Sequence, residues 1–235
     1  MGSSKPMRRP SPHVELVGGT AGAAYALDLS VVIPAWNEAA FLEETIDRVT
    51  EALRANQAGG LEWEIVVCDN ASTDDTADIA RRAGARVEFE RERGIASARN
   101  AGARVARGGW LLFIDADTYP PPSLLSDVRV LVGEGGIVGC GSLMRPAGGR
   151  WWMRLKIHRD NIVLWLLGLA PGVFLLCRHE AFRAIGGFNA DLPALEEIGF
   201  VLRLRRYGLA RGLGFRALEI EIGLPDDLKL VHDPI

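Results

Sequence analysis

Alternation between strand and helix patterns along the first half of the chain most constrains its fold. The run LSVVIP at 29–34 predicts a buried strand, and apolar residues at helical spacing follow it between Leu42 and Leu53. The same order then repeats, with strands predicted at 63–69, 85–90 and 110–116 and helices at 72–84 and 96–107. Strands and helices that alternate at this spacing form right-handed βαβ units. The sequence therefore predicts an α/β fold with a mostly parallel central sheet.

The second half of the chain carries weaker signals, and no pattern predicts an element from 209 onward. Elsewhere we expect a helix at 122–132, a strand near 136–143, a strand at 172–177 and a helix at about 195–207. A chain of 235 residues suffices for one sizeable domain, which we place at 29–235. Residues 1–28 are rich in Gly, Ser, Pro and Ala without periodicity, which predicts a flexible tail.

Charge and cysteine content exclude some partners. The formal net charge of −3 leaves no large basic surface, so we expect no nucleic-acid partner. The three cysteines lie far apart in apolar runs and lack the spacing of a zinc site. This is typical of reduced core residues in a cytoplasmic protein.

Two neighbouring segments bear on membrane contact. Residues 161–177 carry no charge, but Gly168, Pro171 and Gly172 divide them. We therefore expect a buried helix end, a turn and a core strand there rather than a spanning helix. The preceding segment WWMRLKIHR at 151–159 mixes aromatic and basic residues in an expected helix. It suits either peripheral contact at the inner face of a membrane or packing on the protein's own core.

Polar side chains follow three predicted strands at their carboxyl ends, where parallel α/β sheets bind ligands. They are Asn37 and Glu38, Asp69 and Asn70, and Asp115 and Asp117. In an extended chain the carboxylates of Asp115 and Asp117 project to one side and repel each other. Oxygen ligands suit Mg²⁺ or Mn²⁺, which often binds through one or two carboxylates and substrate phosphates. The alternative is a capped turn, because DTYPPP has turn composition.

Asp69 and Arg99 each allow two interpretations. The Asp69 carboxylate could accept an N–H of uracil or guanine beside a helix N-terminus, or this segment could be a helix cap that Ser72, Thr73 and Asp74 supply without it. Arg99 lies one turn into a helix that starts near Gly94. Its guanidinium could contact a ribose or a phosphate, or it could form a surface salt bridge.

Glu196 and Glu197 open the helix predicted at about 195–207. A glutamate in a dry cleft can act as a general base. Acidic residues in a first turn also stabilise a helix through its dipole, particularly where arginines follow in a later turn.

Taken in order, five motifs resemble glycosyltransferase family two, a family of inverting enzymes with the nucleotide-diphosphosugar transferase (GT-A) fold. They are SVVIPAWNE (30–38), VVCDNASTDDT (66–76), GIASARNAGARVARGGWLLFIDADT (94–118), FRAIGGFNADL (182–192) and the EE pair at 196–197. The resemblance extends from about Leu29 to Gly208. Asn70 and Ala71 depart from the Asp and Gly that the family has in the second motif.

The resemblance implies a Rossmann-like three-layer sandwich that binds a UDP- or GDP-linked sugar with Mn²⁺ or Mg²⁺. Asp69 would bind the base, Asp115 and Asp117 would hold the ribose and the metal on the diphosphate, and Arg99 would lie alongside the donor. The implied donor-binding set is completed by Pro34, Asn37, Glu38, Asn70 and Ala116.

The resemblance also implies a catalytic position on the acceptor side. Glu197, with Glu196 beside it, falls where the family usually has a catalytic Asp. It would take the proton of an acceptor hydroxyl during a single inverting displacement. The acceptor stays open among a glycan, a lipid-linked molecule and a small molecule.

Other functions compete with this interpretation. FIDADT also resembles the first motif of haloacid-dehalogenase-like phosphatases, and LPDD at 224–227 faintly resembles their distal acidic motif. That strand should open the phosphatase fold, whereas three βα units precede it here. A nicotinamide-binding protein is disfavoured because no Gly-x-Gly-x-x-Gly follows the first strand. A non-catalytic nucleotide-sugar-binding protein is the third alternative, and we expect His232 to be an exposed tail residue rather than a metal ligand.

Overall fold

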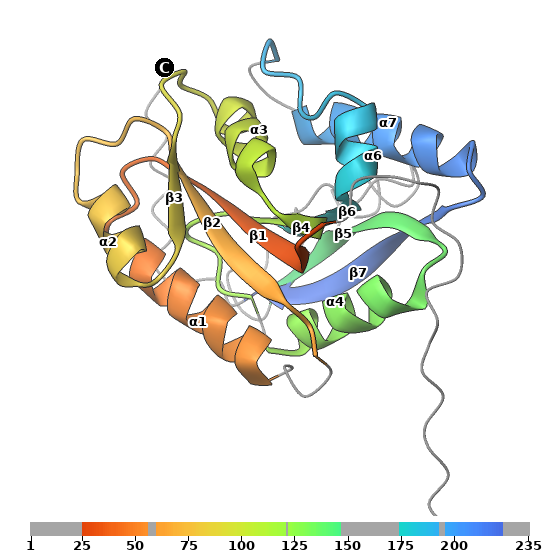
Figure 1. The fold of residues 1–235 in the computed structure, drawn as a ribbon, viewed down its shortest axis with the longest axis horizontal. Coiled ribbons are helices and arrows are strands. Elements are labelled where there is room, and N and C mark those ends of the chain that lie inside the picture. The colour runs from red at the N-terminus through yellow and green to blue at the C-terminus, as the bar shows by residue number, and fades with distance from the viewer. Residues whose placement is uncertain (1–24, 56–59, 121, 147–173, 193–195, 223–235) are drawn as a thin grey trace, which may run out of the picture.

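The computed structural model describes residues 25–55, 60–120, 122–146, 174–192 and 196–222. At its centre lies a seven-stranded sheet with the order β3-β2-β1-β4-β6-β5-β7 (Figure 1). The strands are β1 (Leu27–Ala35), β2 (Trp63–Asp69), β3 (Arg86–Phe89), β4 (Gly108–Ile114), β5 (Ile137–Pro146), β6 (Phe174–Arg178) and β7 (Gly214–Ile222). The helices are α1 (Leu42–Ala55), α2 (Thr76–Arg82), α3 (Ile95–Val105), α4 (Pro122–Glu134), α6 (His179–Ala184) and α7 (Glu196–Leu209).

Neighbouring strands run parallel except at β6. Strands β3, β2, β1 and β4 form one parallel block, and β5 pairs in parallel with β7. Strand β6 lies antiparallel between β4 and β5. The predicted α/β fold with a mostly parallel sheet is therefore confirmed, and one reversed strand joins its two parallel parts.

Helices cover both faces of the sheet and bury a core on each (Figure 1). On the face of α1 and α4, residues such as Leu125 pack with Ile33 of β1. On the face of α3, α6 and α7, Phe182 and Phe200 pack with Val32 of β1. Successive β1 residues thus enter opposite cores, as the two-residue period of a strand requires. The result is the three-layer sandwich that the sequence resemblance implies.

Small residues of helix α3 face the sheet and let the helix pack against it closely. A Cβ atom added to Gly102 would lie 2.5 Å from Cγ1 of Val32, so only glycine permits this approach. Ala98 and Ala101 are buried in the same contact region, against Cys68 of β2. The close packing holds the first turns of α3 against the carboxyl edge of the sheet.

The sequence predicts that this helix begins at Ser72, whereas α2 begins at Thr76. The polar side chains ahead of the helix bind the loop after β1 instead. The backbone N–H of Asn37 donates to Oγ of Ser72 (3.0 Å), and that of Ala39 donates to Oδ2 of Asp74 (3.2 Å). The residues that resemble a helix cap therefore join two strand-end loops to each other.

Other differences concern segments without a strong local pattern. Strand β7 pairs with β5 in the stretch from 209 onward, and α6 is a short helix that the sequence does not predict. The predicted tail boundary at 28 falls inside β1, and the ring of Tyr25 stacks on His179 with centroids 4.9 Å apart. Predictions for 1–24, 151–159, 161–173, 224–227 and His232 lie outside the described residues.

The cysteines agree with a further prediction. Cys68, Cys140 and Cys177 are free and buried, as expected for core residues. None of the helices in the described ranges is long and apolar enough to cross a membrane.

Candidate active site

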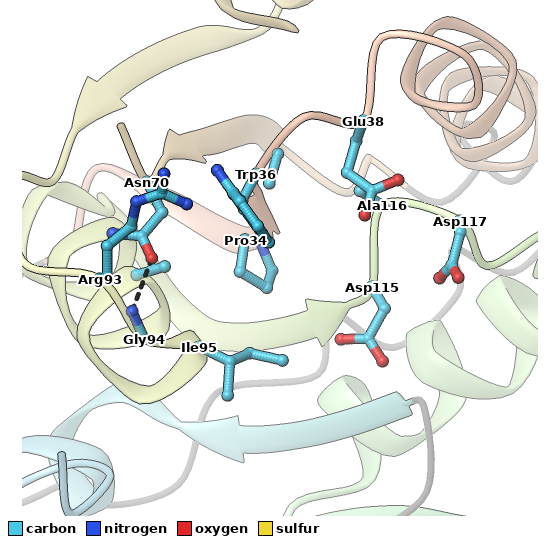
Figure 2. Close-up of a pocket in the computed structure, with 12 residues that line it drawn as sticks. Pro34, Trp36, Glu38, Asn70, Arg93, Gly94, Ile95, Asp115, Ala116 and Asp117 are labelled. Atoms are coloured by element: carbon cyan, nitrogen blue, oxygen red, sulfur yellow. Dashed lines mark hydrogen bonds between the residues drawn. The ribbon is translucent and has the colours of Figure 1, made fainter. Parts of the chain in front are cut away.

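A pocket of about 650 Å³ opens at the carboxyl edge of the parallel block (Figure 2). Strands β1, β2 and β4 end there, and α3 begins there. The pocket is lined by Pro34, Ala35, Trp36, Glu38, Asn70, Arg93, Gly94, Ile95, Ala98, Asp115, Ala116 and Asp117. Of the predicted donor-binding residues, six belong to this lining: Pro34, Glu38, Asn70, Asp115, Ala116 and Asp117. Asn37, Asp69 and Arg99 are not part of it.

Carboxylates gather at one end of the pocket, where Glu38 approaches Asp115 and Asp117 (Figure 2). Burial raises the pKa of Glu38 to about 7, and Asp117, Asp74 and Asp115 add to the rise. Burial also raises the pKa of Asp115 above its usual range, although Arg99 opposes this effect. Burial and mutual repulsion make the charged forms of these carboxylates unfavourable. A cation placed among them would stabilise the charged forms.

The backbone at Asp115 and Asp117 is a turn as well as part of the pocket wall. The N–H of Thr118 donates to the carbonyl oxygen of Asp115 (3.1 Å), and Oγ1 of Thr45 donates to the carbonyl oxygen of Ala116 (2.6 Å). The two interpretations of this motif are thus compatible, because the turn itself holds both aspartates at the pocket. Thr45 anchors that turn to α1.

The acidic end suits a divalent ion that takes part of its coordination from a ligand. Among the described residues, no group of three or more His, Cys, Asp or Glu side chains is arranged to hold a metal ion by itself. Mg²⁺ and Mn²⁺ commonly bind through one or two carboxylates and complete their coordination with phosphate oxygens and water. Asp115 and Asp117 fit this mode of binding, with Glu38 nearby.

Arg99 is a buried hub and not the surface salt bridge that the residue alone favours. Only 3% of the residue is exposed. Its Nη2 lies 2.9 Å from Oδ1 of Asp115 and 2.6 Å from Oε1 of Glu197, and its Nη1 lies 3.3 Å from Oε1 of Glu196. Burial lowers the pKa of Arg99, but Glu197 and Asp115 outweigh burial and raise it overall. One cation therefore connects the pocket's acidic end to the first turn of α7.

Glu197 combines partial exposure with a raised pKa. Its side chain is 27% exposed, whereas that of Glu196 is 9% exposed. Burial raises the pKa of Glu197 to about 7, with Asp115 and Glu196 adding to the rise and Arg99 opposing it. A carboxylate with such a pKa can accept a proton near neutral pH. Of the two glutamates, Glu197 is the more exposed to solvent.

Asn37 shapes the site from behind the pocket. Its φ of 56° is left-handed, and its Oδ1 accepts the backbone N–H of Thr73 (2.8 Å). Asn tolerates this conformation better than most residues. Asn37 therefore connects the loops after β1 and β2. Its fixed backbone positions its two neighbours in the chain, Trp36 and Glu38, at the pocket.

Asn70 lines the pocket but uses its side chain to hold a loop. Its Nδ2 donates to the carbonyl oxygens of Glu90 (3.1 Å) and Glu92 (2.6 Å), and its Oδ1 accepts the N–H of Gly94 (2.8 Å). These bonds fix the connection from β3 to α3. Asn70 thus positions Gly94, the N-cap residue of α3.

Asp69 is buried at the end of β2, outside the pocket lining. Its Oδ1 accepts the backbone N–H of Ser72 (3.0 Å). This bond occupies one carboxylate oxygen within the loop after β2, and it caps no helix, because α2 begins at Thr76. The predicted contact between Asp69 and a nucleobase stays a prediction.

Sequence reasoning missed Trp36, Arg93 and Ile95 as pocket residues. Figure 2 shows Trp36 and Arg93 with Asn70 at the end of the pocket opposite the carboxylates. Trp36 directly follows β1, and Arg93 directly precedes Gly94, the N-cap residue of α3. Their positions next to predicted strand and helix ends were the available signal.

Comparison with known proteins agrees with this geometry. The model for glycosyl transferase family 2 matches residues 30–188. The chain is 30% identical over 184 residues to a PGL/p-HBAD biosynthesis glycosyltransferase of Mycobacterium tuberculosis, covering 74% of this chain and 68% of that protein. It is 39% identical over 107 residues to validoxylamine A glucosyltransferase of Streptomyces hygroscopicus subsp. jinggangensis, covering 43% of this chain and 24% of that protein. The match thus spans only about a quarter of the second relative.

Solved structures share the fold at low sequence identity. A mannosyltransferase from Pyrobaculum calidifontis, in complex with GDP-Man and Mn²⁺, aligns with a TM-score of 0.63 and 22% identity, covering 87% of this chain and 61% of that one. Glucosyl-3-phosphoglycerate synthase from Mycobacterium tuberculosis, in complex with Mn²⁺, UDP and glucosyl-3-phosphoglycerate, aligns with a TM-score of 0.63 and 23% identity, covering 87% of this chain and 74% of that one.

The mixed sheet and the structural neighbours define a GT-A-like α/β fold. The chain belongs to glycosyl transferase family 2, a family of nucleotide-sugar-dependent glycosyltransferases. This membership decides against the phosphatase alternative.

Proposed function

We propose that this chain is an inverting, metal-assisted glycosyltransferase that moves a sugar from a UDP- or GDP-linked donor to an acceptor hydroxyl. The observation that carries the proposal is the Arg99 hub, which joins Asp115 of the pocket to Glu197 of α7. A donor-side carboxylate and a candidate base are thereby held by one side chain. The structural neighbours that bind Mn²⁺ with GDP-Man or with UDP support the choice of donor and metal for this chain.

The polarity of the pocket suggests how a donor lies in it. The carboxylate end, with Asp115 and Asp117, suits the diphosphate and its cation, and Glu38 adjoins them. The opposite end, with Trp36 and Arg93, suits the nucleoside. When bound, a divalent cation would screen the diphosphate and stabilise the charge that develops on the leaving nucleotide.

Glu197 supplies the base in this proposal. The Arg99 guanidinium fixes one of its oxygens, Oε1, at 2.6 Å. The exposed part of the carboxylate accepts the proton of the acceptor hydroxyl, whose oxygen attacks the anomeric carbon from the face opposite the diphosphate. Because the acceptor oxygen displaces the nucleotide in one step, without a covalent intermediate, the configuration inverts.

Donor turnover with water as the acceptor tests the proposal without knowledge of the natural acceptor. The wild type with Mn²⁺ should release nucleotide from UDP-glucose or GDP-mannose, and NMR should show the sugar with inverted anomeric configuration. Glu197→Gln should retain donor binding and lose at least about a hundredfold in rate. Glu180→Gln, which removes an exposed carboxylate of α6, is the matched control and should keep the rate.

Two outcomes would contradict the proposal. Retention of configuration would exclude a single displacement. Donor binding without any release would favour the non-catalytic binding protein that the sequence leaves as an alternative.

A further inference from the structure

Asn100 binds one backbone unit with both ends of its side-chain amide. Its Nδ2 donates to the carbonyl oxygen of Phe188 (2.9 Å), and its Oδ1 accepts the backbone N–H of the same residue (2.9 Å). Asn100 directly follows Arg99 in α3, whereas Phe188 lies in the segment after α6. Because hydrogen bonds are directional, two of them to a single residue fix the orientation of its backbone as well as its position. Phe188 is therefore tied to α3.

Gly187 allows this close contact. A Cβ atom added to Gly187 would lie 2.5 Å from Oδ1 of Asn100, and the residue has a left-handed φ of 68°. Nη2 of Arg203 in α7 donates to the carbonyl oxygen of the same glycine. The segment after α6 is thus bound by side chains of both α3 and α7.

The ring of Phe188 extends this connection to the ion pair between Arg99 and Glu197. It stacks on the ring of Phe200 with centroids 4.2 Å apart, and Phe200 lies about one helical turn after Glu197 in α7. The Cζ atom of Arg99 lies 5.3 Å from the centroid of Phe188. Only 3% of Phe188 is exposed, so close packing restricts its movement. One buried ring therefore contacts the helix that carries Glu197 and lies beside the cation that binds it.

We propose that Asn100 is a positioning residue for the general base: by fixing Phe188, it holds the first turn of α7 at the distance at which Arg99 and Glu197 pair. This inference rests on the proposed function, because it concerns the base named there. Asn100 is not part of the pocket lining, so it acts through Phe188 and not on the donor. A misplacement of about 1 Å can cost roughly a hundredfold in rate. Loss of Asn100 should therefore slow the chemical step and leave donor binding unchanged.

A contribution to folding stability alone is the competing explanation, and the two roles differ in how they depend on Glu197. A positioning residue has nothing left to position once the base is absent, so its removal lowers the rate only when Glu197 is present. A residue that only stabilises the fold has the same effect whether or not the base is present. A double-mutant cycle with Glu197→Gln therefore separates the two roles.

The test measures nucleotide release from UDP-glucose or GDP-mannose by the full chain with Mn²⁺ and with water as the acceptor. Calorimetry measures the binding of UDP and GDP to the same proteins. Asn100→Ala should lower the release rate by about ten- to a hundredfold and change nucleotide affinity by less than about twofold. In the Glu197→Gln background, the same substitution should change the residual rate by less than about threefold.

Ser30→Ala is the matched control for a loss of stability. The buried Ser30 hydroxyl also joins distant segments, because it accepts the backbone N–H of Gly108 (2.8 Å) and donates to Oε1 of Glu64 (2.7 Å). It belongs to β1 and lies outside the pocket lining. This variant should lose stability and keep the release rate within about twofold of the wild type.

Phe188→Leu provides the same test if Asn100→Ala does not fold. Leucine keeps an apolar side chain in the core but removes the ring that stacks on Phe200. The variant should lower the release rate by about tenfold without changing nucleotide affinity, again only when Glu197 is present.

Several results would overturn the positioning role. An unchanged release rate in Asn100→Ala would do so, as would an equal loss of rate in the Glu197→Gln background or in Ser30→Ala. A loss of nucleotide affinity as large as the loss of rate would also do so. A wild type that releases no nucleotide, or whose release does not depend on Glu197, would overturn the proposed function and the positioning role together. Release that depends on Glu197 but not on Asn100 would leave the proposed function standing and remove only the positioning role.

Discussion

The Glu197 carboxylate is held by Arg99, whose Nη2 lies 2.6 Å from Oε1 of the glutamate. Arg99 belongs to α3, next to the pocket, and Glu197 belongs to the first turn of α7. The almost fully buried Arg99 side chain thus supplies the positive charge that faces both the pocket and the first turn of α7. Because Asp115 and Glu196 share the same guanidinium, loss of Arg99 would leave three carboxylates without their cation.

Arg99→Met should therefore destabilise the protein strongly. Removing one partner of a buried ion pair leaves uncompensated charge, and we expect a loss of about 2–4 kcal/mol at pH 8, since two of the three carboxylates are partly exposed. The loss should shrink at pH 5, where those carboxylates can take up protons. Urea unfolding at both pH values measures this.

Arg104→Met is the matched control, because Arg104 lies on the same helix with a 63% exposed side chain. It should cost less than about 0.5 kcal/mol. An equal cost for both variants would show that Arg99 has no special structural role.

The raised pKa of Glu197 predicts a specific dependence of stability on pH in the metal-free protein. Its pKa is about 7 in the folded chain and near 4.5 for an ordinary glutamate, so the folded state binds more protons between these values. Stability from this group is fully present below about pH 4.5 and is lost as pH rises towards 7. Glu197→Gln should remove this dependence, so that its stability falls by roughly 2 kcal/mol less than that of the wild type between pH 5 and 7.5. Parallel stability–pH curves for the two proteins would contradict the raised pKa.

Metal and nucleotide binding should be coupled. Since no group of three or more ligand side chains in the described residues is arranged to hold a metal alone, Mn²⁺ should bind weakly by itself and at least about tenfold more tightly with UDP or GDP present. Asp117→Ala should abolish this gain. Calorimetric titration of Mn²⁺ with and without nucleotide measures it.

Asp47→Ala removes an exposed aspartate of α1 outside the pocket and should leave that coupling unchanged. Equal Mn²⁺ affinity in the presence and absence of nucleotide would argue against a metal that the donor and the protein share.

Ala71 occupies a backbone conformation that favours glycine. Its φ is 57°, in the left-handed region, directly after Asn70 at the end of β2. Ala71→Gly should stabilise the protein by about 0.5–1 kcal/mol, because relief of the left-handed strain exceeds the entropic cost of glycine.

The comparison substitution is Ala77→Gly in α2, where the backbone is helical. It should destabilise by about 1 kcal/mol, because glycine is costly inside a helix. Thermal unfolding of both variants checks the opposite signs, and a loss of stability in Ala71→Gly would contradict the predicted strain.

Local patterns determined much of this protein from its sequence. The β-branched run of β1 and the apolar spacing of α1 place these elements correctly, because both depend on periodicities within a single segment. The carboxyl-edge rule likewise placed Glu38, Asp115 and Asp117 at one pocket, because parallel strands that end together must present their following residues together.

Tertiary structure alone decided the remaining features, because each depends on a contact between distant segments. The reversed strand β6 enters between β4 and β5, and no local pattern specifies that pairing. Arg99 resembles a surface residue in the sequence, yet helix α7 covers it and makes it the cation between Asp115 and Glu197. Trp36 and Arg93 meet only because Asn37 and Asn70 hold their loops. Burial and pairing between distant segments determine these contacts. The sequence of a single segment contains no information on either.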